Sequence, residues 1–267
     1  MKKKYALSVV AALALFGAAP AFAADMPVKA EPAPAAVPSP FDIAFGTAFT
    51  SDYVLRGISQ TMRNPAVQGY FEGDYKVTPW LTLYAGLWGS NVKFANSGAT
   101  AELDLSGGGR FSWGNFGLDV GYVYYFYPGD SSIEYGEFYG KPSYKVTDWL
   151  TLNAQVIGGD NFGNAGITGV YYAGGPSISL PNFLPMGITS SISGNYGYQY
   201  VQGGGSYSTW DAGISFTYKA ITLDLRYFDT NGQGNTTGGC ALPSGTKTCD
   251  ASFVATLKFD TTLSALK

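Results

Sequence analysis

The sequence contains no histidine, and its charged residues are scarce. Without histidine, neither a Ser-His-Asp triad nor a Cys-His pair can form, and metal sites built on imidazole are excluded. Asp, Glu, Lys and Arg make up 13% of the 267 residues, whereas soluble domains carry about 25%. The lack of histidine argues against an enzyme, and no catalytic residue, cofactor or metal ligand is predicted.

Cysteine is nearly absent as well. The two cysteines, Cys240 and Cys249, lack the C-x-x-C spacing of thiol redox proteins. In an exported protein such a pair is expected to form one disulfide, which would close a short loop and stabilise it by about 2–3 kcal/mol. We therefore predict a structural Cys240–Cys249 disulfide, with thiol redox chemistry as the alternative.

Glycine and tyrosine are abundant, with 36 and 20 residues. Low charge with high glycine and tyrosine suits a sheet that has one face in lipid, and silk-like low complexity is the competing interpretation. The stretch 75–92 argues against the latter, because Leu81, Leu83, Ala85 and Leu87 alternate with polar or small residues as in a strand. Its first half returns at 144–152, which predicts a repeated hairpin.

The N-terminus has the three parts of a secretory signal. Lys2, Lys3 and Lys4 are followed by an apolar run, and Ala21 to Ala23 form an A-x-A cleavage site. We predict a signal peptide over 1–23 and a Pro/Ala-rich periplasmic linker over 24–40. Cleavage would leave 13 basic and 19 acidic residues, a net charge near −6 that disfavours nucleic acid as a partner.

From residue 41 to 267 the chain predicts an all-β, transmembrane, antiparallel, up-and-down barrel of about twelve strands. The alternating runs lie near 42–54, 65–77, 80–93, 99–113, 116–128, 134–146, 149–160, 169–180, 186–202, 207–219, 221–230 and 251–260. Short and long connections alternate, which is typical of outer-membrane barrels and places both termini on the periplasmic side. A soluble β-sandwich is the alternative, but its strands are usually only about 5–6 residues long.

Tyrosine and tryptophan gather near the predicted strand ends, as expected for interfacial girdles. These residues are Trp80, Trp113, Trp149, Tyr124, Tyr125, Tyr127, Tyr196, Tyr198 and Tyr200. Trp80 and Trp149 are expected at the periplasmic rim, beside the short turns.

The alternation predicts which charged residues face the lumen. The candidate lumen-lining residues are Arg56, Glu72, Asp74, Lys76, Glu102, Asp104, Arg110, Asp119, Asp224, Arg226 and Lys258, with Glu137, Lys141, Lys145, Asp211, Lys219 and Asp260 on the same face. Buried charges must pair or touch water. Two interpretations stay open: a wet pore that mildly favours cations, or a closed interior held by ion pairs. Arg56 is expected either at a constriction or, as we favour, paired with a carboxylate.

Residues 51–60 read SDYVLRGISQ, 65–69 read PAVQG and 84–92 read YAGLWGSNV. This combination resembles the TorF-type porin family, a group of conserved exported outer-membrane proteins of Proteobacteria, over essentially the whole chain after the linker. The resemblance implies a porin-like barrel in a Gram-negative outer membrane and fixes no substrate. Barrels of this kind usually end on an aromatic residue, whereas here Phe259 is followed by eight further residues.

The sequence therefore predicts a porin-like channel for passive diffusion of small polar solutes or ions. Its partners would be outer-membrane lipid and those solutes, and a homo-oligomer is left open. A structural or adhesive barrel with a filled lumen is the second hypothesis. A barrel enzyme is the third, and the lack of histidine argues against it.

Overall fold

The computed structural model describes residues 39–182, 184–231, 240 and 247–266. The predicted signal peptide and all but the end of the predicted linker lie outside the described residues. Within the part that is described, no helix is long and apolar enough to span a membrane.

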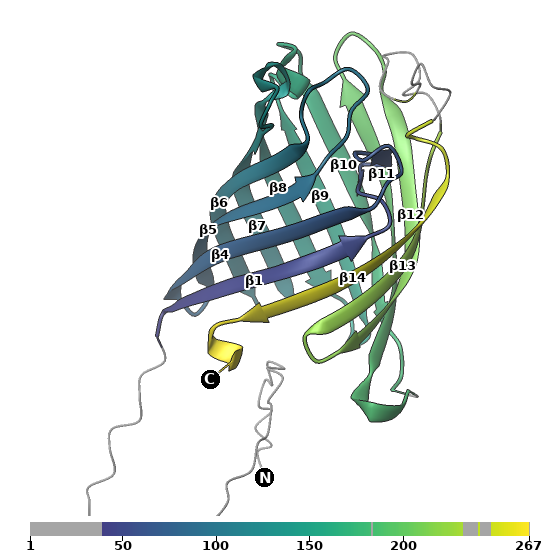
Figure 1. Cartoon of the computed structure of the whole chain (residues 1–267). Helices are drawn as coiled ribbons and strands as arrows, with labels where there is room; N and C mark the ends of the chain where they lie inside the picture. The colour runs from purple at the N-terminus through teal and green to yellow at the C-terminus, as the bar shows by residue number, and fades with distance from the viewer. Residues whose placement is uncertain (1–38, 183, 232–239, 241–246, 267) are drawn as a thin grey trace, which may run out of the picture.

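Twelve antiparallel strands form one closed barrel (Figure 1), which confirms the predicted fold class. Each strand pairs with its neighbours in sequence, and the last strand pairs with the first to close the wall. The strands are β1 (Phe41–Thr50), β4 (Ala66–Thr78), β5 (Leu81–Asn91), β6 (Ala101–Trp113), β7 (Phe116–Phe126), β8 (Tyr135–Lys145), β9 (Leu150–Gly159), β10 (Gly169–Ser179), β11 (Thr189–Val201), β12 (Tyr207–Tyr218), β13 (Ile221–Thr230) and β14 (Ser252–Thr262).

The connections separate into a short-turn end and a long-loop end of the barrel. Strands β4 and β5, β6 and β7, and β12 and β13 are each joined by two residues at the short-turn end, where both termini of the barrel also lie (Figure 1). The longer connections carry the short 3₁₀ helices η1 (Ser131–Ile133) and η2 (Phe162–Asn164). Two more 3₁₀ helices, η3 (Pro185–Gly187) and η5 (Ser264–Leu266), lie at the short-turn end.

The first predicted strand was too long. The pairing of β1 with β4 ends at Thr50 opposite Ala66, so the residues beyond Thr50 have no place in the wall. They form a separate two-stranded hairpin from β2 (Val54–Leu55) and β3 (Ile58–Ser59). At the other end of the chain, β14 continues to Thr262, so Phe259 lies inside the last strand.

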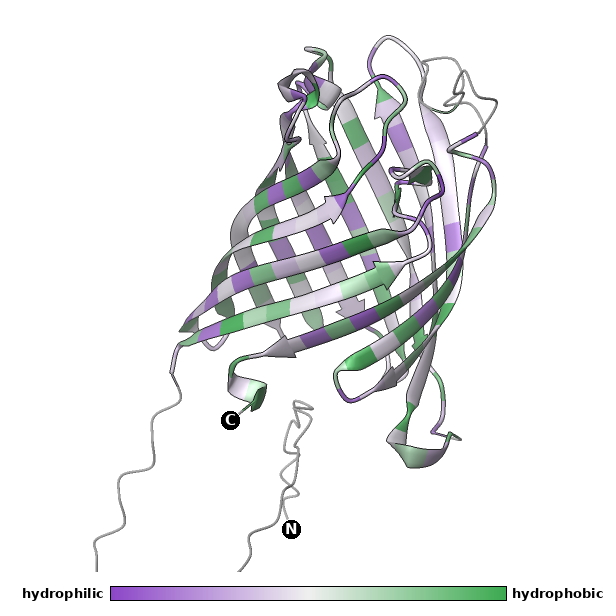
Figure 2. Ribbon diagram, viewed as in Figure 1, coloured by the Kyte–Doolittle hydropathy of each residue, from purple (hydrophilic) through white to green (hydrophobic). Residues whose placement is uncertain are grey.

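Side chains alternate between an outward and an inward face along each strand. Hydrophilic and hydrophobic residues follow one another in bands along many of the strands in Figure 2. Large apolar side chains are exposed on the outward face, for example Leu83, Leu87 and Leu225. A soluble barrel would cover such side chains with a second layer, whereas a lipid-facing wall leaves them bare.

Stacked aromatic rings encircle part of the outward face at the short-turn end. The ring of Trp80 stacks on that of Trp113 at 6.1 Å, and Trp113 stacks on Phe116 at 6.2 Å. Trp149 is exposed beside another short turn. Tyr125 and Tyr127 were wrongly expected in a girdle: both are buried, at 6% and 5% exposure.

Packing inside the barrel is uneven. The fully buried polar side chains Glu102, Glu137 and Gln199 all lie near the long-loop ends of their strands. Toward the short turns the inward side chains are more open, with Arg110 at 42% and Asp119 at 25% exposure. The long-loop half of the lumen is therefore packed, and the short-turn half is accessible to water.

The outward face can be tested at Leu225, in the middle of β13. We expect Leu225→Arg to lower the free energy of unfolding from lipid vesicles by about 2–4 kcal/mol, because it places a charge in the hydrocarbon layer. Leu225→Ala, which removes the side chain without adding charge, should lose clearly less. Equal losses in urea titrations would show that Leu225 does not face lipid.

Candidate functional site

The hairpin of residues 53–60, called here the lumen hairpin, turns into the barrel at its long-loop end. Its two-residue turn consists of Arg56 and Gly57, with φ of 50° and 78°. A two-residue turn of this hand needs positive φ at both positions, which glycine tolerates and arginine adopts at a cost. A Cβ on Gly57 would also lie 2.6 Å from a methyl of Thr230, so the tip fits against the wall only with glycine there.

Arg56 is the buried anchor of the lumen hairpin. Its guanidinium forms a two-pronged ion pair with Glu137 of β8 and donates to Gln199 of β11 at 3.0 Å. Tyr207 of β12 donates to the Arg56 carbonyl at 3.1 Å. Burial alone would lower the pKa of Arg56, but Glu137 raises it above its ordinary value, so the arginine stays charged. Three strands thus hold the tip in place.

The base of the lumen hairpin is fixed by short polar contacts. Asp52 accepts hydrogen bonds from Ser59 at 2.6 Å and from Thr61 at 2.7 Å, which close the hairpin on itself. Tyr53 donates to Glu102 of β6 at 2.9 Å, and its ring packs 5.3 Å from that of Trp88 on β5. The two sequence patterns that carry the family resemblance therefore lie in contact. Residues 51–60 contain the hairpin, and residues 84–92 belong largely to strand β5, against which Tyr53 packs.

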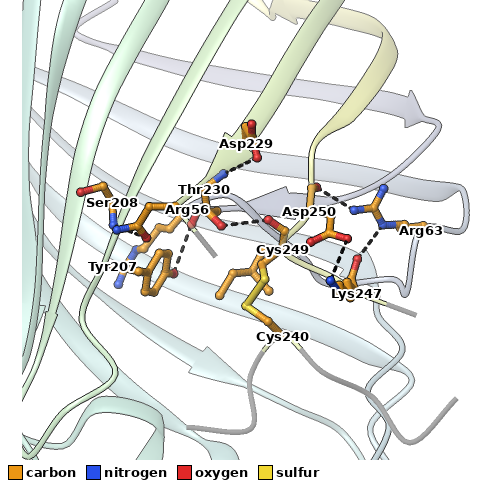
Figure 3. Close-up of a disulfide and its surroundings, with 12 residues drawn as sticks. Arg56, Arg63, Tyr207, Ser208, Asp229, Thr230, Cys240, Lys247, Cys249 and Asp250 are labelled. Carbon is orange, nitrogen blue, oxygen red and sulfur yellow. Dashed lines mark hydrogen bonds and ion pairs between the residues drawn. A yellow bond between two sulfur atoms is a disulfide. The ribbon is translucent and has the colours of Figure 1, made fainter. Parts of the chain in front are cut away.

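Residues 247–250 of the last long loop contact the lumen hairpin and the segment that follows it, beside the disulfide shown in Figure 3. Cys240 and Cys249 form a disulfide, with their Cα atoms 5.2 Å apart. The Thr248 amide donates to the Cys240 carbonyl at 3.1 Å, and the Thr248 carbonyl accepts from the Ser59 amide at 2.8 Å. The Thr230 hydroxyl donates to the Cys249 carbonyl at 2.9 Å. The disulfide therefore lies where the last long loop contacts both the lumen hairpin, at Ser59, and strand β13, at Thr230.

Below the hairpin, one cluster of charges lies on β4, β6 and β7. Arg110 pairs with Glu72 at 2.7 Å, with Asp74 at 3.1 Å and with Asp119 at 3.6 Å. Its guanidinium also lies 4.0 Å over the ring of Tyr84, whose hydroxyl donates to Asp119. One guanidinium thus pairs with three carboxylates, so the net charge of this cluster is negative.

A second cluster lies on β12 and β13. Arg226 forms ion pairs with Asp211 and Asp224, and it donates to the Ser193 hydroxyl at 2.8 Å. Ser215 donates to Asp224 at 2.6 Å. Here two carboxylates share one guanidinium and several hydroxyl groups, so each charge has a partner.

The other predicted lumen residues occupy different environments. Glu102 and Asp104 lie in the packed half, where one oxygen of each is buried without a hydrogen-bond partner among the described residues. Lys76 and Lys258 are on the inward face but exposed to the open half. Lys219 was wrongly assigned to the lumen, because it occupies the two-residue turn between β12 and β13 and covers the ring of Tyr218.

Two cavities lie along the inward wall. One, of ≈ 180 Å³, is bounded by Arg56 and Gly57 of the hairpin and by Gln155, Tyr171 and Asp211 of the wall. The other, of ≈ 260 Å³, is lined by residues of β8 to β11 and includes Gln155 as well. Among the described residues, no group of three or more acidic or cysteine side chains is placed to hold a metal ion.

Sequence reasoning missed the tyrosines of the lumen. Tyr125 donates to Glu137 at 3.0 Å, and Tyr171 packs under the Arg56 guanidinium at 5.3 Å. The signal was present for Tyr125: the alternation that places Tyr124 outward places its neighbour inward. The tendency of tyrosine to collect at membrane interfaces obscured it.

A family model described as "Bacterial protein of unknown function (Gcw_chp)" matches residues 34–260. This chain belongs to that family. The TorF-type name stays a prediction, because the Gcw_chp description assigns no function. No curated protein sequence matches this Gcw_chp chain.

Solved structures share the barrel with this Gcw_chp chain. One, from work on the in-meso crystallization of membrane proteins, has a TM-score of 0.54 and 9% identity, with 84% of each chain covered. The COG4313 outer membrane channel from Pseudomonas putida F1 has a TM-score of 0.48 and 11% identity, covering 88% of this chain and 100% of that one. The NanC porin has a TM-score of 0.45 and 7% identity, covering 81% and 97%. At such identities the likeness shows the fold alone.

The Arg56–Glu137 pair can be tested by a double-mutant cycle. Arg56→Met should lower the free energy of unfolding by about 3–5 kcal/mol, because it leaves the Glu137 carboxylate buried and unpaired. The double variant Arg56→Met/Glu137→Leu should recover most of that loss, since no charge is then buried. Additive losses in urea titrations would show that the two side chains do not interact.

The disulfide should contribute to stability by closing a loop with a sequence separation of 9. We expect reduction to lower the free energy of unfolding by about 2–3 kcal/mol. The variant Cys240→Ser/Cys249→Ser should match the reduced protein and be insensitive to reductant. A wild-type protein whose unfolding is unchanged by reductant would contradict a bracing role for the bond.

Proposed function

We propose that the chain is an outer-membrane channel of porin type, in which small polar solutes and ions diffuse passively past the lumen hairpin. The observation that carries the proposal is a closed barrel with a bare apolar outside and a water-accessible charged inside in one half. In lipid, a closed barrel satisfies all backbone hydrogen bonds. In the other half, the hairpin tip reaches the opposite wall and would set the size limit.

The predicted secretory signal and linker support the same location. An exported chain with this fold is suited to the outer membrane of a Gram-negative bacterium, with outer-membrane lipid against its exposed leucines. The short turns and both barrel termini would lie in the periplasm, and the lumen hairpin would narrow the barrel at the cell-surface end. We infer no catalytic activity, and one barrel would be sufficient for conduction.

A second candidate function is a non-conducting barrel with a structural or adhesive role. One observation favours it: Arg56 and Glu137 are 7% and 0% exposed, so the hairpin tip sits in a dry, filled section of the lumen. The two functions differ in whether ions cross the hairpin level. Conductance therefore separates them directly.

Replacing the lumen hairpin tests the proposal. The Tyr53 amide and the Thr61 hydroxyl are 3.3 Å apart, so a short Gly-Ser linker can join Asp52 to Met62. Purified wild-type protein in a planar bilayer should give discrete current steps, and the linker variant should give larger ones. The variant Leu225→Ala, which changes an outward side chain of β13 and leaves the hairpin and its ion pair intact, should stay near the wild type.

A barrel shown to be folded by its heat-dependent gel mobility, but giving no current in either the wild type or the linker variant, would leave the filled-barrel function. Current only in the linker variant would make the hairpin a closed plug rather than a size limit.

A further inference from the structure

The inward wall of the barrel differs in charge from one side to the other. Strands β9, β10 and β11, which the structure describes throughout, contain no Asp, Glu, Lys or Arg. Their inward side chains are instead amides and hydroxyls, notably Asn153, Gln155, Ser177, Ser193 and Asn195. These three strands are neighbours in the barrel, so they form one continuous uncharged wall.

The charges on the rest of the wall are largely engaged with one another. Arg110 is held by Glu72 and Asp74, and Arg226 is held by Asp211 and Asp224. Paired charges that already have hydrogen-bond partners offer little to a passing ion. The uncharged wall of β9 to β11, called here the amide wall, instead offers neutral donors and acceptors.

The larger cavity lies mainly on that uncharged wall, and the smaller one meets the wall at Gln155 and Tyr171 and is also bordered by Asp211 of β12. The ≈ 260 Å³ cavity is lined by Asn153, Gln155 and Asn195, and the ≈ 180 Å³ cavity continues from Gln155 to the hairpin tip at Arg56. Asn195 donates one hydrogen bond to Asp211 at 3.2 Å. The carboxamides of Asn153 and Gln155 make no side-chain hydrogen bond within the described part of the chain. Gln155 borders both cavities, so its carboxamide lies between the hairpin tip and Asn153.

A carboxamide presents one acceptor oxygen and two donor hydrogens, which matches a hydroxyl group that both donates and accepts. A neutral solute rich in hydroxyl groups would replace its water contacts with these side chains at no electrostatic cost. One charged residue borders the larger cavity, Lys141. Its ammonium lies 4.4 Å over the ring of Tyr139, and Lys141 is opposite Asp119 in the strand register. The ring and the carboxylate both reduce the positive potential that Lys141 produces in the cavity.

We propose that β9 to β11 form a binding track for uncharged, hydroxyl-rich solutes of monosaccharide size. The proposal rests on the channel function proposed above and names the class of solute that the channel favours. Solutes would bind at Asn153 and Gln155 after passing the hairpin tip. Free ions would cross the same lumen without a binding site on this wall.

Solute block of the ion current tests the track. With KCl current established for the mature barrel in a planar bilayer, glucose should reduce the current in a concentration-dependent way. Gluconate and glucosamine, its anionic and cationic counterparts, should block less at equal concentration. In Asn153→Leu/Gln155→Leu the half-blocking glucose concentration should rise about fivefold or more, because two amide contacts are lost, while KCl conductance stays similar.

A control variant separates the track from general damage to the lumen. Thr222→Val removes an inward hydroxyl of β13, away from the amide wall, and should leave glucose block unchanged. Asn153→Ala/Gln155→Ala provides a second test if the leucine variant does not fold. KCl current that glucose does not affect, or that gluconate blocks better, would overturn the track alone. Absence of KCl current would overturn the channel and the track together.

Discussion

The position of the lumen hairpin, in the first long loop, depends on a buried ion pair between Arg56 and Glu137. Both side chains are nearly or fully removed from solvent, and taking two charges out of water is costly. The cost is offset because Gln199 accepts a further hydrogen bond from Arg56, and Tyr125 donates one to Glu137. An ion pair held by these contacts tolerates few alternative positions, so it specifies where the hairpin sits more than it adds stability.

The location of the hairpin decides the character of the whole lumen. By filling the long-loop half, it leaves a water-accessible half between its tip and the short turns, and the ion-pair clusters of Arg110 and Arg226 lie there. These clusters gather on either side of the uncharged strands β9 to β11. The inward face of the barrel therefore combines an uncharged stretch on β9 to β11 with two clusters of paired charges beside it.

Periodicity predicted the wall of this barrel well. Alternation over ten or more residues is a strong signal because an error of one residue would turn the apolar side chains of a strand into the lumen. The alternation predicted the strand ends less well. Strand β1 ends at Thr50, because its partner β4 begins at Ala66. Lys219 lies in the two-residue turn between β12 and β13 and not in a strand. Tyr125 was expected in the interfacial girdle because tyrosine collects at membrane interfaces, although the alternation places its side chain inward.

The sequence by itself determined the strand number, the closed antiparallel order and the inward face of most charged residues, because each depends on neighbours along the chain. It could also indicate that Arg56 would meet a carboxylate, since the lumen offered several. Only the tertiary structure decided which one: Glu137 lies 81 positions away, and Gln199 lies 143 positions away. The direction of a loop has no periodic signature. It follows from contacts that exist only once the barrel has closed around the hairpin.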